Sequence, residues 1–573
     1  MIALARLTAL WRRLPVDGRP FCDRALETLG VTCELAESER AKVPRDGPLV
    51  VVANHPTGAL DGLLLLSLIG SARPDVKVLA NRWLGCIPEL RADLIPVEVF
   101  RRRKRTRANA SSIRAAIQWV RSGHALIVFP AGEVAHANDG DGRPTDSAWQ
   151  LAVAHVVRST GAAVLPVFIP GRNSTLFEWG GRIHPLLRTA MLPRELLRRR
   201  GCTVTLRVGS PIAPSRLAQF SNLFQLTSYL RIRTMALDLR RRGSAPETAP
   251  AIVQSHPQQG IAREVGALRE TQVLARSGQL DVCLAHADEI PTALREIGRL
   301  REIAFRAAGE GSGTECDLDR FDRHYLHLFV WNRERDEIVG AYRAGLTDEI
   351  LAQSGVHDLY TSTLFKYDRS LIEEIGPAME LGRAFVRPEY QRDYSPLLLL
   401  WKGIATLVSR MPKYRMLFGP VSISHEYGSL SRQILARFLY ATAYNGRLGH
   451  LVAGRNEPAF LRPRRDLRPG AGSVVRTLTE VTTLLSEIEA DGKGVPVLLR
   501  QYLKLNARLL GFNVDAAFGN ALDALMLVDL LAVDRSILVR YMGADGAQAF
   551  LSCHGAPEAS VSNVVASRER RAS

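Results

Sequence analysis

The stretch Leu-Val-Val-Val-Ala-Asn-His-Pro-Thr-Gly-Ala-Leu-Asp-Gly, residues 49–62, decides the fold of the first half of the chain. Its first five residues are apolar, which predicts a buried strand over residues 49–53. The proline and glycine that follow predict a tight loop with exposed backbone, and a helix pattern starts at Gly62. Because catalytic groups commonly lie where strands end in α/β folds, His55 and Asp61 are the first candidates for chemistry.

Strands and helices continue to alternate on either side of this stretch. Residues 111–121 have a helical pattern, and a helical segment over 215–242 closes the region. Further strands are predicted over residues 125–129, 164–169 and 203–208. Such alternation is typical of an α/β layer structure.

A change of composition separates this region from a second one. Residues 243–260 are rich in alanine, proline, serine and glutamine, which indicates a linker. Beyond it the patterns predict helices over 294–308, 396–410 and 497–510 and strands over 326–331, 338–343 and 381–386. We therefore predict an α/β protein with domains over 1–242 and 263–545, a linker over 243–262 and a disordered tail over 546–573.

The overall charge narrows the class of partner. The 573 residues include 75 lysines and arginines against 58 acidic residues, a formal net charge of +17. Such a field attracts nucleic acid, anionic lipid headgroups or acidic proteins, although many chains are simply basic. The absence of zinc-finger spacing, of a lysine-rich tail and of a glycine–aromatic run argues against nucleic acid. The seven cysteines are scattered, which indicates a reduced, cytoplasmic protein without a metal site.

No segment approaches the ~20 apolar residues needed to span a bilayer. The N-terminal residues 1–15 have two interpretations. They form either a helix that lies on a membrane surface or a first helix that packs on its own domain.

The loop after the first strand holds the groups that acyl transfer to a hydroxyl needs. One group must take the hydroxyl proton, and a second must hold that base in the right tautomer. A histidine with a nearby carboxylate, here His55 and Asp61, supplies both. The alternative for His55 is a histidine that only stabilises its loop.

Three segments resemble the conserved blocks of the glycerolipid acyltransferase superfamily. They are the loop around His55, the segment Phe129-Pro130-Ala131-Gly132-Glu133 and the strand Val164–Val167. The resemblance implies catalytic roles for His55 and Asp61 and a substrate-binding role for Glu133. Two departures stand out: five rather than four residues separate His55 from Asp61, and the glutamate does not directly follow Pro130. The longer spacing is expected of a bacterial subgroup of lysophospholipid or hemolysin-like acyltransferases.

One basic segment and one further arginine are candidates for anion binding in this domain. Six of the seven residues 101–107 are positive, and we interpret this run, with Arg102 inside it, as a site for phosphate or carboxylate. The anion would come from an acceptor lipid, the membrane surface or an acyl carrier protein. A solvated charged loop is the alternative. Arg172, after the Val164–Val167 strand, is a second candidate for the acceptor headgroup.

The second region carries four short motifs, at residues 301–305, 319–322, 339–343 and 380–383. Their types and order resemble those of acyl-homoserine lactone synthases, which are GNAT-fold enzymes that acylate an amine from acyl-acyl carrier protein. The tryptophan that follows the first motif in those enzymes has no counterpart here. The longer runs 380–404 and 418–424 resemble ornithine-lipid N-acyltransferases more closely. The resemblance implies donor and acceptor roles for Arg301, Phe305, Asp319, Asp322, Arg343, Glu380 and Arg383.

Physical arguments leave two of these roles open. Glu380 is our candidate for the base that deprotonates the amine. The alternative is that Glu380 forms a structural ion pair with Arg383. Asp319 and Asp322 either hold a cationic amino acid or cap a helix.

The donor is expected to be an acyl carrier protein. The segment 391–396 before the long helix has no glycine and contains an acid and a proline, so it is poorly suited to the pyrophosphate of coenzyme A. The single phosphodiester of phosphopantetheine needs fewer backbone N–H donors than a pyrophosphate does. An acidic carrier protein also complements a basic chain.

Taken together, the chain resembles bifunctional ornithine lipid synthases. The resemblance implies that the C-terminal GNAT-like domain acylates an amino acid with a 3-hydroxyacyl group and that the N-terminal domain then esterifies the new lyso-lipid. It implies a peripheral location on the cytoplasmic, inner face of a bacterial membrane and no bound cofactor. Ornithine is the first choice of amino acid, and lysine, glutamine and glycine stay open.

Two other classes of function remain at this point. One is a lysophosphatidic acid or lysophospholipid acyltransferase whose GNAT-like module only binds the acyl carrier. The other is a membrane-active, hemolysin-like protein without catalysis, against which the His55 loop and the 129–133 segment argue.

Overall fold

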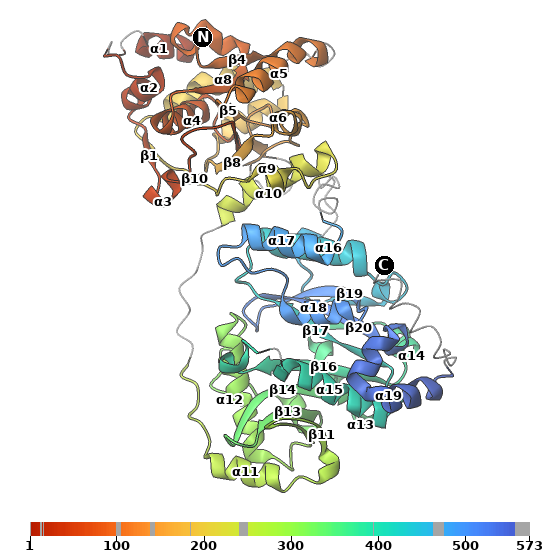
Figure 1. The fold of residues 1–573 in the computed structure, drawn as a ribbon. Coiled ribbons are helices and arrows are strands. Elements are labelled where there is room, and N and C mark those ends of the chain that lie inside the picture. Colours follow the sequence, from red (N-terminus) through yellow and green to blue (C-terminus); the bar gives the residue numbers. More distant parts are fainter. Residues whose placement is uncertain are drawn as a thin grey trace. The chain divides into compact units, whose positions relative to one another are not determined.

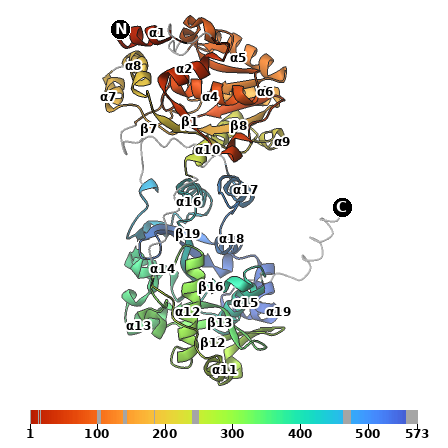
Figure 2. The same cartoon turned by 90° about the vertical axis from the view of Figure 1, so that its left-hand side faces the viewer.

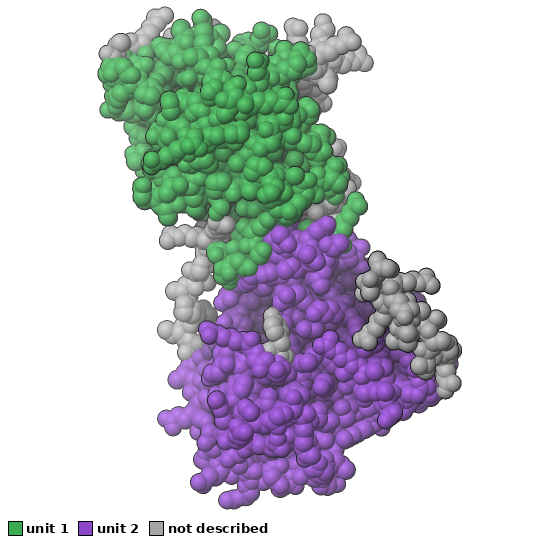
Figure 3. Space-filling model, in the orientation of Figure 1, with its two compact units in different colours: residues 1–242, 463–476, 486–492 green, residues 243–462, 477–485, 493–573 purple. Residues whose placement is uncertain are grey.

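A computed structural model describes residues 2–11, 14, 17–98, 105–137, 144–183, 185–239, 250–393, 395–461 and 475–555. The chain forms two compact units (Figure 3). The first consists mainly of residues 1–242 and the second mainly of residues 243–573, with 463–476 and 486–492 assigned to the first unit.

The first unit is built on a six-stranded sheet with the order β10-β8-β2-β5-β3-β4. All neighbours are parallel except β10, which is antiparallel to β8. The strands are β2 (Leu49–Ala53), β3 (Val76–Asn81), β4 (Leu94–Val97), β5 (Ala125–Val128), β8 (Ala163–Phe168) and β10 (Arg207–Val208). The strand predicted over 203–208 is in fact two, because β9 (Thr203–Thr205) pairs with β1 (Thr32–Glu34) in a separate sheet.

Helices cover both faces of this sheet (Figure 1). Helices α2 (Phe21–Leu29) and α4 (Ala59–Ala72) share one core with Val51 and Ala53. Val50 and Val52, which point to the opposite face, are equally buried, and α5 (Arg105–Arg121) contacts β5. Burial on both faces is why the central strands read as unbroken apolar runs.

The remaining helices of this unit are α1 (Ile2–Trp11), α3 (Glu37–Arg40), α6 (Ala152–Thr160), α7 (Thr175–Ile183), α8 (Pro185–Arg198), α9 (Pro214–Leu217) and α10 (Leu223–Leu239). Leu7 of α1 is buried in the core of the unit, and the Trp11 ring lies 5.6 Å from that of Phe21. Of the two interpretations of the N-terminus, the packing favours a helix that belongs to its own unit. None of the helices in the described ranges is long and apolar enough to cross a membrane.

The second unit contains an eight-stranded sheet with the order β11-β12-β13-β14-β16-β17-β20-β19. Only β16 and β17 are parallel; the other neighbours are antiparallel. The strands are β11 (Val273–Ser277), β12 (Leu280–Ala285), β13 (Leu326–Asn332), β14 (Glu337–Leu346), β16 (Ala378–Val386), β17 (Met416–Ile423), β19 (Arg508–Asp515) and β20 (Ala521–Asp529).

Two long helices lie on opposite faces of this sheet, as Figures 1 and 2 show. Helix α12 (Pro291–Ala307) packs on Cys283 and Phe329. Helix α15 (Ser395–Arg410) places Gly403 against Val282 and Leu328, which point the other way because side chains alternate along a strand. The other helices are α11 (Gln258–Gly266), α13 (Thr347–Gln353), α14 (Arg369–Ile375), α16 (Ser429–Ala443), α17 (Leu478–Ile488), α18 (Val497–Lys504) and α19 (Arg535–Cys553).

The two parallel strands separate part-way along their length. Residues 378–380 of β16 pair with residues 416–418 of β17, and beyond this point no pairing joins them, although both strands continue. Gly419 lies at the point of separation, where a Cβ would come within 1.9 Å of the Leu381 carbonyl oxygen. Only glycine fits there, and the sheet opens directly after it.

Several predicted boundaries differ from those of the structure, and three of the differences have a clear physical reason or extend a unit. The helix predicted over 497–510 ends at Lys504, because Asn506 turns the chain with φ 58° and β19 begins at Arg508. Helix α11 starts at Gln258, inside the predicted linker, where Ile261 joins the core of the unit. Helix α19 reaches Cys553 and so extends beyond residue 545. The tail from residue 556 lies outside the described residues.

Candidate active sites

His55 and Asp61 meet directly after β2. Nδ1 of His55 lies 2.9 Å from Oδ2 of Asp61, and the Asp61 side chain is fully buried. Asp61 also accepts the backbone N–H of Thr57 at 2.8 Å, the N–H of Gly58 at 2.9 Å and the Thr57 hydroxyl. The extra residue between His55 and Asp61 therefore does not separate them, because the loop closes around the carboxylate.

The backbone of His55 is fixed from three sides. Its N–H donates to Oδ1 of Asp146 at 3.1 Å, and its carbonyl accepts the N–H of Ala135 at 2.8 Å. The preceding Asn54 exchanges two hydrogen bonds with the backbone of Ile169, at 2.8 and 2.7 Å. Asn173 donates to the carbonyl of Pro56 at 3.0 Å.

The imidazole ring of His55 is held in one orientation. It stacks on Phe129, with ring centroids 4.2 Å apart and planes inclined by 25°. Since the carboxylate of Asp61 can only accept, it selects the tautomer with the proton on Nδ1. Nε2 is then the basic nitrogen, and the side chain keeps 18% of its surface exposed. This arrangement suits a base that receives a proton from a bound hydroxyl.

The other residues predicted for this site lie at different depths. Glu133 is exposed on the loop after Phe129 and accepts the Ser147 hydroxyl at 2.5 Å. Arg172 is also exposed, and its carbonyl accepts the Arg199 guanidinium. Arg102 lies outside the described residues.

In the second unit, the predicted charged residues form one buried network. Arg301 donates to the carbonyl of Asp317 at 3.1 Å and to Oδ1 of Asp322 at 3.2 Å. Nη1 of Arg343 lies 2.6 Å from Asp319 and 3.2 Å from Asp322. Although burial acts in the opposite direction, these two guanidinium groups hold the pKa of Asp322 below its ordinary value.

Arg383 completes the network at the opening of the sheet. Its guanidinium lies 3.4 Å from Asp317 and 3.5 Å from Asp319 and is centred about 5 Å from the rings of Tyr360 and Phe518. Arg383 has φ 51° and sits in a bulge where β16 slips against β14. Such strain in a residue other than glycine is often found at functional sites.

Glu380 lies deeper and is fully engaged. One carboxylate oxygen accepts the Thr361 N–H at 2.6 Å, and the other accepts the Tyr325 hydroxyl and the Tyr360 N–H. Burial raises its pKa. Because both oxygens fix the 360–361 backbone and only 1% of the residue is exposed, these contacts favour a positioning residue over the predicted base.

Phe305, the remaining predicted residue, lies on α12 and packs edge-on against Phe518, with centroids 5.0 Å apart. Phe518 belongs to the turn between β19 and β20, more than 200 residues away in sequence. Phe305 thus packs against Phe518, and Phe518 in turn contacts Arg383 of the network.

Comparison with known proteins assigns both units to families. Residues 5–240 match the family described as Acyltransferase, and residues 300–402 match the Acetyltransferase (GNAT) domain. A glycine N(alpha)-acyltransferase of Bacteroides thetaiotaomicron is 35% identical over 43% of this chain and 77% of its own length. The chain is a fused acyltransferase with an N-terminal acyltransferase domain and a C-terminal GNAT domain.

Two further relatives of the fused acyltransferase come from Phocaeicola vulgatus. A glycine N(alpha)-acyltransferase is 29% identical over 44% of this chain and 80% of its own length. A lyso-glycine lipid O-acyltransferase is 28% identical over 35% of this chain and 75% of its own length.

Several residues at the two sites were missed from the sequence. Asp146 holds His55 from 91 positions away and has no local signature. Asn54 stood in the quoted motif and was a signal that we did not use. Tyr325, Tyr360 and Phe518 line the second site. In the sequence they cannot be told from aromatic residues of the hydrophobic core.

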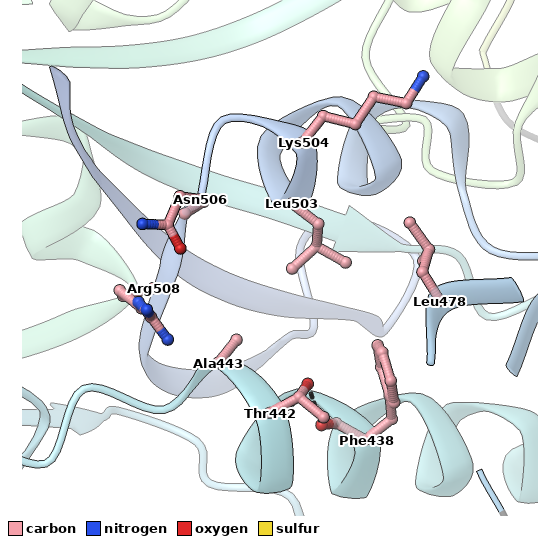
Figure 4. Close-up of a pocket in the computed structure, with 9 residues that line it drawn as sticks. Phe438, Thr442, Ala443, Leu478, Leu503, Lys504, Asn506 and Arg508 are labelled. Atoms are coloured by element: carbon pink, nitrogen blue, oxygen red, sulfur yellow. Dashed lines mark hydrogen bonds between the residues drawn. The ribbon is translucent and has the colours of Figure 1, made fainter. Parts of the chain in front are cut away.

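One pocket lies away from both sites (Figure 4). It has a volume of about 250 Å³ and lies between α16, α17, α18 and the start of β19. Leu503 points toward Thr442 and Phe438, whereas Lys504 extends away. The pocket contains none of the predicted residues. Among the described residues, no group of three or more histidine, cysteine or acidic side chains is placed to hold a metal ion.

Replacing Asp61 with alanine should destabilise the first unit, because the Thr57 and Gly58 N–H groups lose their acceptor. We expect the free energy of unfolding to fall by about 2–4 kcal/mol in denaturant titrations. The exposed Glu37→Ala on α3 is the matched control, with an expected change within about 0.5 kcal/mol. Equal effects of the two substitutions would contradict the role given to Asp61.

Arg343→Met should cost the second unit about 3–5 kcal/mol at neutral pH, because the buried Asp322 and the partly exposed Asp319 lose this cation. The cost should shrink as pH falls below the ordinary carboxyl range, since a protonated Asp322 no longer needs the partner. Arg335→Met, whose side chain is 70% exposed, serves as control. A penalty that does not change with pH would show that packing rather than charge is lost.

Proposed function

We propose that the fused acyltransferase makes an amino-acid lipid by two successive acylations. The second unit transfers a 3-hydroxyacyl chain to the amine of an amino acid. The first unit then esterifies the new hydroxyl with a second chain. The observation that carries the proposal is that one chain is similar both to a glycine N(alpha)-acyltransferase and to a lyso-glycine lipid O-acyltransferase.

The first unit supports the ester-forming step. Nε2 of His55 takes the proton of the acceptor hydroxyl while the oxygen attacks the thioester carbonyl. The C–O bond forms, the C–S bond breaks, and the imidazolium returns the proton to the leaving thiolate. Asp61 stabilises the imidazolium at 2.9 Å without becoming protonated itself. We assign Glu133 and Arg172, which are exposed, to contacts with the acceptor, and Arg102 to its anionic group.

The second unit supports the amide-forming step. The opening between β16 and β17 exposes backbone groups of both strands to an extended acyl donor. Arg383 lies at this opening, where Asp317 and Asp319 hold it in place. Arg301, Arg343 and Asp322 form the rest of the network behind these two carboxylates. Glu380 positions the 360–361 backbone below it.

An acyl carrier protein is the proposed donor. At the start of α15, Oδ1 of Asp393 accepts the N–H and the hydroxyl of Ser395, at 2.9 and 2.8 Å. A carboxylate thus occupies the end of the helix where a pyrophosphate would otherwise bind. The net charge of +17 favours an acidic carrier and an anionic membrane surface.

Ornithine remains the proposed acceptor, and glycine is the second candidate. The names of the relatives favour glycine. The buried carboxyl groups of Glu310 and Asp523, near Arg383, favour an acceptor with a second cation.

Lipid mass spectrometry of a bacterial host without aminolipids tests the two-step proposal. The wild-type chain should give a diacylated amino-acid lipid, and His55→Ala should accumulate the mono-acylated amide. Arg383→Met should give neither lipid, while its first unit still esterifies added lyso-lipid in lysates. A change in phosphatidic acid without any amino-acid lipid would favour a glycerolipid acyltransferase instead.

The donor proposal predicts a preference for acyl-acyl carrier protein over acyl-coenzyme A. The kcat/KM with the carrier protein should fall as salt rises from 50 to about 500 mM, because oppositely charged partners are screened. Steady-state rates with both donors and equal acyl chains provide the measurement. Equal or higher kcat/KM with the coenzyme A thioester, at any salt, would contradict it.

A further inference from the structure

Three loops of the second unit converge beside Arg383. They are the turn after α12, the segment after β17 and the turn between β19 and β20. The Ser424 hydroxyl donates to the Ala308 carbonyl at 2.6 Å. A Cβ on Gly519 would lie 2.7 Å from the Gly309 carbonyl oxygen, so the backbones meet closely. The convergence is therefore built into the fold.

Two carboxyl groups, Glu310 and Asp523, lie under these loops. Ser422 is opposite Asp523 in the pairing of β17 with β20, and its hydroxyl donates to Oε2 of Glu310 at 2.7 Å. Glu380 is opposite Phe418, and side chains alternate along β17, so Glu380, Ser422 and Asp523 share one face of the sheet. Both carboxyl groups thus lie beside the part of β17 that β16 leaves unpaired.

Neither carboxyl group has a cationic partner among the described residues. Asp523 is only 4% exposed, and its Oδ2 is buried without any hydrogen-bond partner. Arg383 is close enough to lower the pKa of Asp523, but its guanidinium is bound to Asp317 and Asp319. A buried carboxylate without a partner is costly, and a bound cation would relieve the cost.

The pKa shifts of both carboxyl groups agree with a site that binds a cation. Burial, and then the neighbouring Asp515, raise the pKa of Asp523 well above its ordinary value, and Glu310 adds to this. Burial, with Glu426 nearby, raises the pKa of Glu310 to about 7. Both carboxyl groups are therefore protonated more easily than ordinary carboxyl groups when no cation is bound.

We propose that Asp523 and Glu310 form the receptor for an ammonium group of the amino-acid acceptor. The proposal deepens the proposed function and rests on it. An ammonium donates three hydrogen bonds, which match the free Oδ2 of Asp523 and the carboxylate of Glu310. Arg383, whose Nε is buried without a partner, supplies the positive counterpart for the acceptor carboxylate.

When the bound group is the α-ammonium, the same pair also provides the proton balance of amide formation. A carboxylate takes one proton from the ammonium, and the neutral amine attacks the thioester carbonyl. The C–N bond forms and the C–S bond breaks. The proton held by the carboxyl group then passes to the leaving thiolate, while the second amine proton goes to water.

Ligand-induced stabilisation of the full chain tests the receptor directly. Glycine or ornithine should raise the melting temperature of the wild type, because a ligand that binds only the folded state stabilises it. Asp523→Asn and Glu310→Gln should weaken this binding about 10- to 100-fold, as loss of a charge-assisted hydrogen bond does. Asp281→Asn, which removes a buried carboxyl group from the distant strand β12, should leave binding unchanged.

The two amino acids identify which ammonium is bound. A loss of binding with both glycine and ornithine assigns the pair to the α-ammonium, and a loss with ornithine alone assigns it to the side-chain ammonium.

Unchanged binding in Asp523→Asn and Glu310→Gln, or no binding by wild type, would overturn the proposed receptor. Amino-acid binding without any acylation from carrier protein or coenzyme A would refute the proposed function and leave the receptor standing.

Glu310→Gln has a second readout that a merely structural residue would not give. The groups that act on Glu310 are Ser422 and Glu426. Glu310 and Arg383 both act on the neighbouring Asp523. A pKa raised from 4.5 to about 7 means that stability falls as pH rises through this range. Without ligand, Glu310→Gln should therefore melt a few degrees above wild type at pH 8 and near it at pH 4.5. A lower melting temperature at pH 8 would contradict the proposal.

Discussion

A carboxylate that is removed from water must be matched by donors or cations, and both candidate sites are organised by this requirement. The buried Asp61 is matched by the Thr57 and Gly58 N–H groups, the Thr57 hydroxyl and Nδ1 of His55. All four of these donors belong to the loop that starts at the end of β2. The loop conformation, the tautomer of His55 and the direction of Nε2 therefore follow from one buried charge.

The second unit meets the same requirement with charges of both signs. Arg301 and Arg343 neutralise Asp322, and Arg383 bridges Asp317 and Asp319 beside the opening of the sheet. This network fixes Arg383 through its ion pairs with Asp317 and Asp319. Glu310 and Asp523, next to this network, lack a cation from the described part of the chain itself. The ammonium group of an amine acceptor would supply that positive charge.

The sequence was sufficient where a feature depends on neighbouring residues. The apolar run before Asn54 predicted β2, and the succession of motifs from Arg301 to Arg383 predicted one site. It was insufficient where distant segments meet: Asp146 reaches His55, and Asp523 reaches Ser422, through sheet topology alone. Glu380 shows a third case. A glutamate early in a strand looks like a base, and only its contacts with Tyr325 and the 360–361 backbone favour a positioning role instead.

The central claim is that one chain holds two sites that act one after the other on a released intermediate. Mixing purified His55→Ala and Arg383→Met chains with amino acid and 3-hydroxyacyl carrier protein tests it most directly. The account predicts that each variant alone makes no diacylated lipid and that the mixture makes it after a lag, as the mono-acylated amide accumulates and is consumed. A mixture that yields no more diacylated product than the separate variants, although each single step is active, would contradict it.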